Sequence, residues 1–116
     1  MIPKGVEDLL FSFPLGKRVL VHGVFPYTGF EIVTLSEAKG GVFDSAVSLH
    51  AILREEDPIS VIRRMVELSK GLVFLADERR DESKLRRITF YTARNMGFEV
   101  YDLDDWFALV KLRPKD

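Results

Sequence analysis

The chain has 116 residues, a length that suits one domain with a single hydrophobic core. Hydrophobic residues make up 47% of it and charged residues 30%, a mixture typical of a globular domain rather than of a disordered or membrane protein. The formal net charge of −1 excludes the broad positive field on which nonspecific nucleic-acid binders depend, so nucleic-acid binding is not expected.

The scarcity of certain residue types indicates where in the cell, and at what temperature, the protein is expected to work. Without cysteine the chain has no disulfide or zinc–thiolate chemistry, and a cytoplasmic location is expected. No apolar run approaches the roughly 18–20 residues needed to cross a bilayer. The chain has no glutamine and one asparagine, Asn95, alongside abundant Glu, Lys and Arg. This bias is typical of thermophilic proteins, because amides are labile in heat and ion-pair networks are favoured there.

The first part of the chain predicts a short helix and then a buried strand. GVEDLLFSF places Leu9, Leu10 and Phe13 on one side of a helix that Pro14 ends. The β-branched run KRVLVHGVF is too short for a helix and predicts a buried strand over 18–24.

The next segment, TGFEIVTLSEAKGG, fits either a strand or a helix. Its IVTL run suits a strand, but Thr28 and Glu31 have the spacing of a capping box, and Gly40-Gly41 is a strong helix stop. Parallel strands usually need a connection of about a dozen residues or more, most often a helix. Because strand 18–24 is expected to pair in parallel with the strand that follows this segment, we favour a helix over 29–39.

Two further strands flank a second helix. The runs DSAVSL and GLVFLADE predict strands near 43–48 and 72–76. Asp57 followed by Pro58 suits the cap and first position of a helix, and Gly71 is expected at its C-terminal end. Apolar residues at helical spacing mark its buried face: Ile59, Ile62, Met65 and Val66.

A third helix and a hairpin complete the chain. The helix is expected from Asp81 to Met96, with Gly97 as its stop and a buried face of Leu85, Ile88 and Thr92. The tail FEVYDLDDWFALVKL predicts two antiparallel strands joined by a tight turn at Asp104–Asp105. The expected fold is therefore α/β: one domain over 1–116, with a mostly parallel five-stranded sheet between two layers of helices and a C-terminal antiparallel hairpin.

Motifs in this order resemble those of the class I S-adenosylmethionine-dependent methyltransferases, which implies a Rossmann-like three-layer sandwich. The first strand and its turn, VLVHGVFPYTG, are similar to the family's cofactor-binding strand, with Gly23 and Thr28-Gly29 at the matching ends. The closing GFEVYDLDDWFALVKLR is similar to the family's last hairpin, whose final strand inserts antiparallel. The resemblance covers most of 17–113. Its central part is matched by Phe43-Asp44, Ser48, Leu53 and Asp57-Pro58.

The same residues suggest roles in a site. The resemblance implies that Gly23, Thr28 and Gly29 hold the methionine end of S-adenosylmethionine, the expected cofactor. Ser48 and His50 would face the methyl acceptor, as the candidate catalytic residues.

The other polar residues at this rim have ordinary structural explanations beside the functional ones. Asp77 shares the rim and is a further candidate contact, although it also opens a charged loop. Ser48 also suits a cap for the following segment, and for His22 and His50 the commoner role is a packed histidine bonded to backbone. No metal site is expected, because the DLDD run at 102–105 suits a hairpin turn.

Other features depart from the family. Its cofactor turn places glycines that allow the ligand close to the backbone, whereas Val24 to Tyr27 are bulky and include a proline. Two further strands with their helices, and the acidic residue that normally holds the ribose, are expected to be missing. If the ambiguous segment were a strand, the position of that acidic residue would be Thr34, which has no charge.

Without those strands, 18–24 would lie at the edge of the sheet as an apolar, unprotected strand. We therefore expect a homodimer or a protein partner to cover the region near Val19–Phe25. Phe25, Pro26 and Tyr27 would fill the former pocket, contact that partner or simply pack the loop.

The favoured function is a reduced methyltransferase-like domain that lacks a complete cofactor site, does not catalyse alone, and acts as a homodimer or a partner subunit. The alternative is an active S-adenosylmethionine-dependent methyltransferase whose site is completed at a subunit interface. A third class is a ligand sensor with a remnant pocket.

Overall fold

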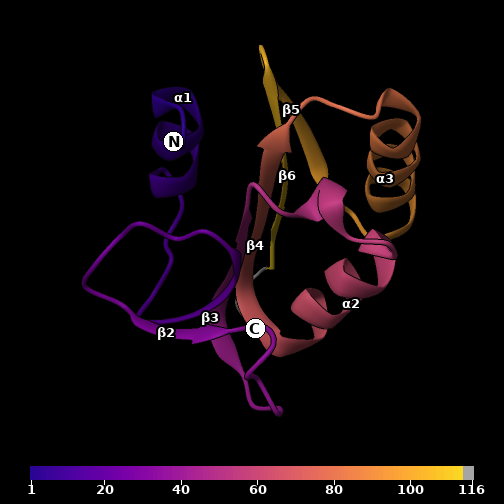
Figure 1. The fold of residues 1–116 in the computed structure, drawn as a ribbon. Helices are drawn as coiled ribbons and strands as arrows, with labels where there is room; N and C mark the ends of the chain where they lie inside the picture. Colours follow the sequence, from indigo (N-terminus) through magenta and orange to yellow (C-terminus); the bar gives the residue numbers. More distant parts are fainter. Residues whose placement is uncertain (114–116) are drawn as a thin grey trace.

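The computed structural model describes residues 1–113, which contain three α-helices, one short 3-10 helix and six strands (Figure 1). The helices are α1 (Lys4–Phe11), η1 (Ile52–Arg54), α2 (Pro58–Leu68) and α3 (Glu82–Asn95). The strands are β1 (Arg18–Gly23), β2 (Glu31–Thr34), β3 (Phe43–Leu49), β4 (Ser69–Glu78), β5 (Glu99–Leu103) and β6 (Trp106–Leu112).

The strands form one mixed sheet in the order β2-β1-β3-β4-β6-β5. The pairs β2–β1, β1–β3 and β3–β4 are parallel, whereas β6 runs antiparallel to both of its neighbours, β4 and β5. The α/β class and the C-terminal hairpin are confirmed. The expected count of five strands is wrong, because β2 makes the sheet six-stranded. The sheet is mixed, with three parallel pairings and two antiparallel ones, both made by β6.

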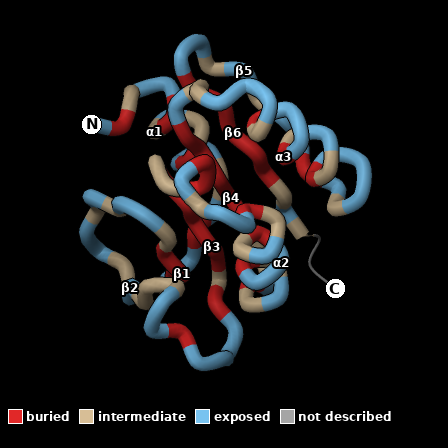
Figure 2. The backbone as a smooth tube through the Cα atoms, turned by 45° about the vertical axis from the view of Figure 1, so that its right-hand side comes forward, coloured by how far each residue is buried: buried red, intermediate tan, exposed pale blue. Residues whose placement is uncertain are grey.

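Helices cover both faces of the sheet, and each face has its own hydrophobic cluster. On the first, here called the α1 face, Val6 and Leu10 of α1 pack over Val19, Val47 and Phe74. On the opposite face, the α2/α3 face, residues of both later helices pack over the strands. Figure 2 shows the buried residues concentrated along the central strands, while β2 and β5 at the two edges are mostly exposed or half-buried.

Local sequence signals explain the starts of α2 and α3. The Asp57 carboxylate accepts a hydrogen bond from the Ser60 N–H (3.3 Å), and Pro58 begins α2 as expected. Asp81 caps α3 in the same way, through the N–H of Lys84.

Gly71 does not end α2, contrary to our prediction. The helix stops at Leu68, and Gly71 lies inside β4. There an added Cβ would lie 2.5 Å from the carbonyl oxygen of Asp44, so the glycine permits a close approach of two strands.

The predicted helix over 29–39 is wrong. Residues 31–34 form β2, whose first bond joins the Glu31 N–H to the Lys17 carbonyl at 2.9 Å, so the Thr28–Glu31 capping box is not used. The chain returns from the end of β1 through residues 24–30 as an extended loop. Because β2 is short, that loop can span the return without a helix.

Aromatic side chains on this loop replace the helix as a cover for the α1 face. The ring of Phe25 lies 5.1 Å from that of Tyr27 and 5.6 Å from that of Phe30, and Tyr27 also meets Phe11 of α1 at 4.9 Å. All three pairs are edge-on, the arrangement aromatic rings prefer. The Phe25 and Tyr27 side chains therefore pack the loop against α1.

Strand β1 consequently lies inside the sheet, between β2 and β3, and is not an edge. The reason given for a partner at Val19–Phe25 is therefore wrong, and the edge on that side is β2. None of the helices in 1–113 is both long and apolar enough to cross a membrane.

Candidate functional site

Polar side chains gather at the carboxyl end of the parallel strands, on the α2/α3 face. His22 Nδ1 lies 2.7 Å from Ser48 Oγ, and His22 Nε2 lies 2.6 Å from a carboxylate oxygen of Glu55. The parallel register places His22 directly opposite Ser48, so the backbone itself brings them together. Ser48 is fully buried, and the side chains of His22 and Glu55 are 12% and 38% exposed.

Serine, histidine and glutamate linked in this order are the residue types of a nucleophile, a base and a group that orients the base. The burial of Ser48 prevents that use, because no substrate can reach its hydroxyl in this structure. The linkage instead ties β1 to β3 and to the segment that follows β3.

That segment, residues 51–55 with η1 at its centre, is here called the η1 segment. It is held over the ends of the strands by side chains from two other elements. Asp77 of β4 accepts a hydrogen bond from the Leu53 N–H (3.0 Å). Lys84 of α3 donates to the carbonyls of Leu53 (2.9 Å) and Glu55 (2.5 Å). The η1 segment therefore closes the end of the sheet where open α/β sheets bind ligands.

Asp77 is a structural anchor rather than the start of a solvated loop. Its side chain is fully buried, and its second oxygen accepts from the Glu78 N–H and from Arg80, both at 2.7 Å. With its bond to Leu53, each carboxylate oxygen has a partner from this chain. The carboxylate is therefore not free to contact a cofactor.

His50 lies apart from Ser48, although the sequence suggested that both face the acceptor. His50 adopts a left-handed backbone (φ 61°), and its ring lies 5.4 Å from that of Trp106 on the α1 face. Its Nε2 is 3.3 Å from a Glu78 carboxylate oxygen, a contact that is near enough for an ion pair but does not have hydrogen-bond geometry. Ser48 points to the α2/α3 face, as Ala46 of the same strand does. His50, two positions further, would follow by alternation, but β3 ends at Leu49 and the left-handed backbone at His50 turns its side chain to the α1 face.

Gly23 is a close-approach glycine, but its own chain makes the approach. Its φ is +84°, and an added Cβ would overlap the carbonyl oxygen of Leu49 and lie 2.7 Å from the Cβ of Ala51. The Leu49 carbonyl also accepts from the Val24 N–H at 3.1 Å. The space that the resemblance assigns to a cofactor beside Gly23 is thus occupied by residues 49–51.

Thr28 and Gly29 lie on the exposed return loop, away from this contact. Nothing lies within 4 Å of an added Cβ at Gly29, whose φ is +90°. No helix begins after the loop, so the helix N-terminus that would receive an anion in a nucleotide site is absent from this part of 1–113.

Asp44 of the Phe43-Asp44 motif acts at the opposite end of the sheet. Its carboxylate accepts from the backbone N–H groups of Arg18 and Lys17, both at 2.9 Å, and fastens the start of β1. The Arg18 N–H, followed by the Lys17 N–H, lowers the pKa of Asp44 below its ordinary value, against the opposing effect of burial.

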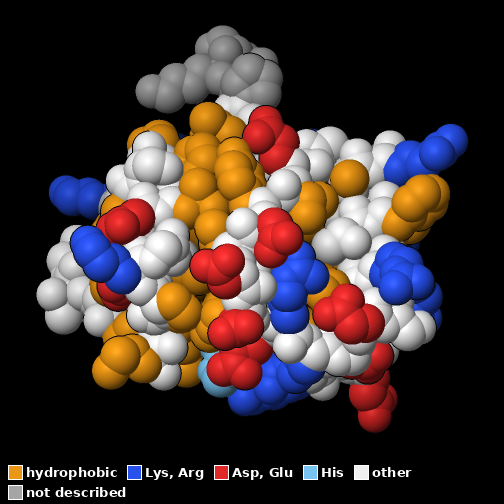
Figure 3. Space-filling model, turned by 90° about the horizontal axis from the view of Figure 1, so that it is seen from above, with side chains coloured by type: hydrophobic (Ala, Val, Ile, Leu, Met, Phe, Trp, Pro, Cys, Tyr) orange, Lys and Arg blue, Asp and Glu red, His pale blue; other side chains and the backbone are white. Residues whose placement is uncertain are grey.

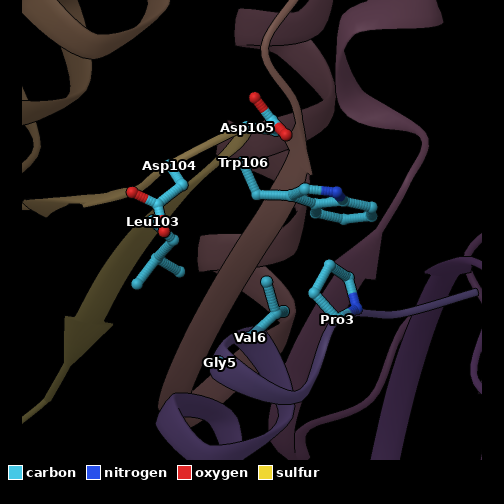
Figure 4. A pocket seen from close by; sticks show the side chains of 7 residues that line it. All are labelled: Pro3, Gly5, Val6, Leu103, Asp104, Asp105 and Trp106. Atoms are coloured by element: carbon cyan, nitrogen blue, oxygen red, sulfur yellow. The ribbon is translucent and has the colours of Figure 1, made fainter.

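Two hollows on the surface lie outside this group of residues. The first, about 310 Å³, is shown in Figure 4, where Trp106 and the β5–β6 turn face Pro3 and Val6 of the N-terminal region. The second, about 380 Å³, lies between the start of α2 and the exposed side of α3. Neither is lined by any of the residues predicted to hold the cofactor or the acceptor, namely Gly23, Thr28, Gly29, Ser48, His50 and Asp77.

The surface over the carboxyl end of the parallel strands carries mixed charge. Figure 3 views it from above and shows acidic and basic side chains interspersed beside a hydrophobic patch. Among residues 1–113, no group of three or more His, Cys, Asp or Glu side chains is placed to hold a metal ion.

Sequence reasoning missed Glu55 and Lys84, which fix the η1 segment. Glu55 is 33 positions from its partner His22, so no local spacing reveals the pair. The parallel pairing of β1 with β3 was the available signal. It places Ser48 opposite His22, and the segment after β3, which contains Glu55, must then lie close to His22. Comparison of the chain with protein-family models, with curated proteins and with solved structures found no match.

Proposed function

We propose that this chain is a reduced, Rossmann-like methyltransferase domain that lacks a complete cofactor site, does not catalyse alone, and acts as a homodimer or as a subunit beside a partner. The sheet order supports the likeness, because β6 inserts antiparallel between β4 and β5, as the last strand of that family does. The presence of β2 accounts for one of the two strands that the sequence suggested were missing.

The observation that carries the proposal is the contact at Gly23. In the family, glycine in this turn lets the cofactor approach the backbone. Here the Leu49 carbonyl and the Ala51 methyl group fill that approach. The η1 segment, held by Asp77 and Lys84, keeps them in place. A cofactor at this position would have to displace the chain's own backbone.

One observation favours the alternative, an active enzyme completed at an interface. Glu37 lies in the turn after β2 and accepts a hydrogen bond from the Thr34 hydroxyl. A carboxylate near the end of the second strand is the group that would hold ribose hydroxyls. In that case S-adenosylmethionine would bind only to the assembled protein, and Glu37→Gln would weaken its binding.

Thermal unfolding with S-adenosylmethionine and S-adenosylhomocysteine at millimolar concentration tests the proposal. A ligand present at a hundredfold excess over its Kd adds about 2.7 kcal/mol of stability. In a domain of this size that is a rise of roughly 10 °C in Tm. We expect no rise, with ATP as the matched control for nonspecific nucleotide effects.

A saturable rise that ATP does not reproduce would refute the proposal. Repeating the titration across protein concentration separates the alternative, because a site shared between copies would bind only where the protein is associated.

A further inference from the structure

Strand β2 has a free outer edge with a defined pattern of backbone groups. The Glu31 N–H donates to Lys17 (2.9 Å) and the Leu35 N–H donates to Val21 (2.8 Å), both on the β1 side. In a parallel ladder, alternate residues point their N–H and C=O to the same neighbour. Ile32, between these positions, therefore directs both of its backbone groups outward, away from β1.

Thr34 and Phe30, two positions to either side of Ile32, also point backbone groups outward, but not all of these groups are free. By the same alternation, the Thr34 N–H points outward, but its carbonyl already accepts from Glu37 (3.0 Å) and Ala38 (3.1 Å) in the following turn. On the other side of Ile32, the Phe30 carbonyl accepts from no backbone N–H within residues 1–113. The edge thus offers an acceptor at Phe30, a donor and an acceptor at Ile32, and a donor at Thr34.

From this pattern we infer that β2 pairs antiparallel with β2 of a second copy of the chain, with Ile32 on the two-fold axis. Each Ile32 exchanges both of its backbone groups with Ile32 of the second copy. Each Thr34 N–H donates to the Phe30 carbonyl of the second copy. The Thr34 carbonyl, already engaged, is not required, so the edge is complementary to itself in this register.

The side chains fit the same register. Glu31, the charged residue of β2, lies opposite Val33 of the second copy, so no like charges face each other. Ile32 is 41% exposed and would meet its equivalent on the α1 face. The strand also lacks the lysine, proline or bulge that protects many sheet edges.

The short strand limits the strength of this dimer. Four residues bury little surface, and interfaces below about 1,200 Å² are typically weak. We therefore expect a dimer that depends on protein concentration rather than an obligate one. This dimer would supply the second copy that the proposed function invokes, and it rests on that proposal for its biological role. The pairing itself requires no cofactor.

Engineered cysteines test the register directly, since the chain has no cysteine of its own. On the two-fold axis, the two Ile32→Cys residues would have Cα atoms about 5.5 Å apart, within disulfide range. Thr34→Cys is the matched control, because its equivalents would be displaced by about 13 Å along the strands. We expect rapid oxidation to a covalent dimer for Ile32→Cys and not for Thr34→Cys.

Light scattering on the wild-type protein, which has no cysteine, measures the association itself. The mass should rise from 13.3 kDa toward twice that value as concentration increases. Ile32→Pro should abolish the rise, because it removes the outward N–H without breaking a bond to β1. Circular dichroism checks that this variant folds, and Ile32→Lys, which places like charges on the axis, should also remain monomeric.

A wild-type mass that stays at 13.3 kDa at millimolar concentration would overturn the inference. So would equal crosslinking of the two cysteine variants, or a dimer that neither Ile32 variant weakens. The cofactor titration decides the proposed function separately. A β2 dimer that binds S-adenosylmethionine refutes only the noncatalytic proposal, whereas a monomer that binds none refutes only the pairing.

Discussion

The contact at Gly23 can be tested with a single methyl group. In Gly23→Ala the new Cβ would overlap the Leu49 carbonyl oxygen and lie 2.7 Å from the Ala51 Cβ. The backbone there has φ +84°, a conformation that costs a side-chain-bearing residue about 1–2 kcal/mol. Overpacking in a closely packed region costs about 1–3 kcal/mol more. We expect Gly23→Ala to lose roughly 2–5 kcal/mol of unfolding free energy.

Gly29→Ala is the matched control. Its φ is +90°, but nothing lies within 4 Å of the added Cβ, so it should lose only the backbone contribution of about 1–2 kcal/mol. The difference between the two variants therefore isolates the clash with Leu49 and Ala51. Equilibrium unfolding in urea measures both values, because the midpoint shifts with stability when the slope is unchanged.

Equal losses in Gly23→Ala and Gly29→Ala would contradict this account. That result would mean that Leu49 and Ala51 move aside at little cost, and that the space beside Gly23 is available to a ligand. A normal stability for Gly23→Ala together with lost S-adenosylmethionine binding would favour the active enzyme.

Two further predictions concern polar anchors. His22→Leu leaves the buried Ser48 hydroxyl without its partner and should lower the free energy of unfolding in urea by about 1–3 kcal/mol. Glu55→Gln changes the more exposed end of the linkage and should lower it by less than about 1 kcal/mol. Equal losses in the two variants would show that the buried bond is unimportant. The backbone N–H groups of Arg18 and Lys17 lower the pKa of Asp44 in the folded protein, so its contribution is present above the ordinary pKa of about 3.9 and is lost as pH falls through the lowered value. Asp44→Asn should therefore be about 1 kcal/mol less stable than wild type near neutral pH, with the gap closing in acid; a gap that is constant with pH would contradict this.

Much of the fold follows from local sequence signals. Asp57-Pro58 and Asp81 begin helices because their side chains satisfy N–H groups within the same turn. The apolar run of β4 predicts a strand buried on both faces, and the Asp104–Asp105 turn predicts the final hairpin. For the two caps and the hairpin turn, the partner that decides the structure lies within a few residues, whereas β4 is recognisable because its apolar run is continuous.

Strand β2 was mispredicted because its partners are distant. A capping box at Thr28 and Glu31 stabilises a helix only if that helix has a face to bury. Here the aromatic side chains of the preceding loop already cover the α1 face. Val33 and Leu35 instead pack on the opposite face, with the period of a strand. Tertiary packing thus overrides the local signal.

The candidate site shows the same division. His22 and Ser48 were placed at strand ends by pattern alone, and the parallel register brings them together. His50 was placed beside Ser48, but its left-handed backbone and the Trp106 ring hold it on the other face. That separation depends on contacts across the sheet, which no spacing in the sequence expresses.

The strength with which the η1 segment is held bears on where function can lie. Three hydrogen bonds to charged groups, from Asp77 and Lys84, contribute about 1.5–3 kcal/mol each. The buried side chains of Ile52 and Leu53, within the segment itself, contribute about 1.5–3 kcal/mol each. The η1 segment is therefore part of the folded core rather than a lid. A ligand that had to open it would forfeit most of its binding energy, so we expect this protein to act through its outer edges and surface.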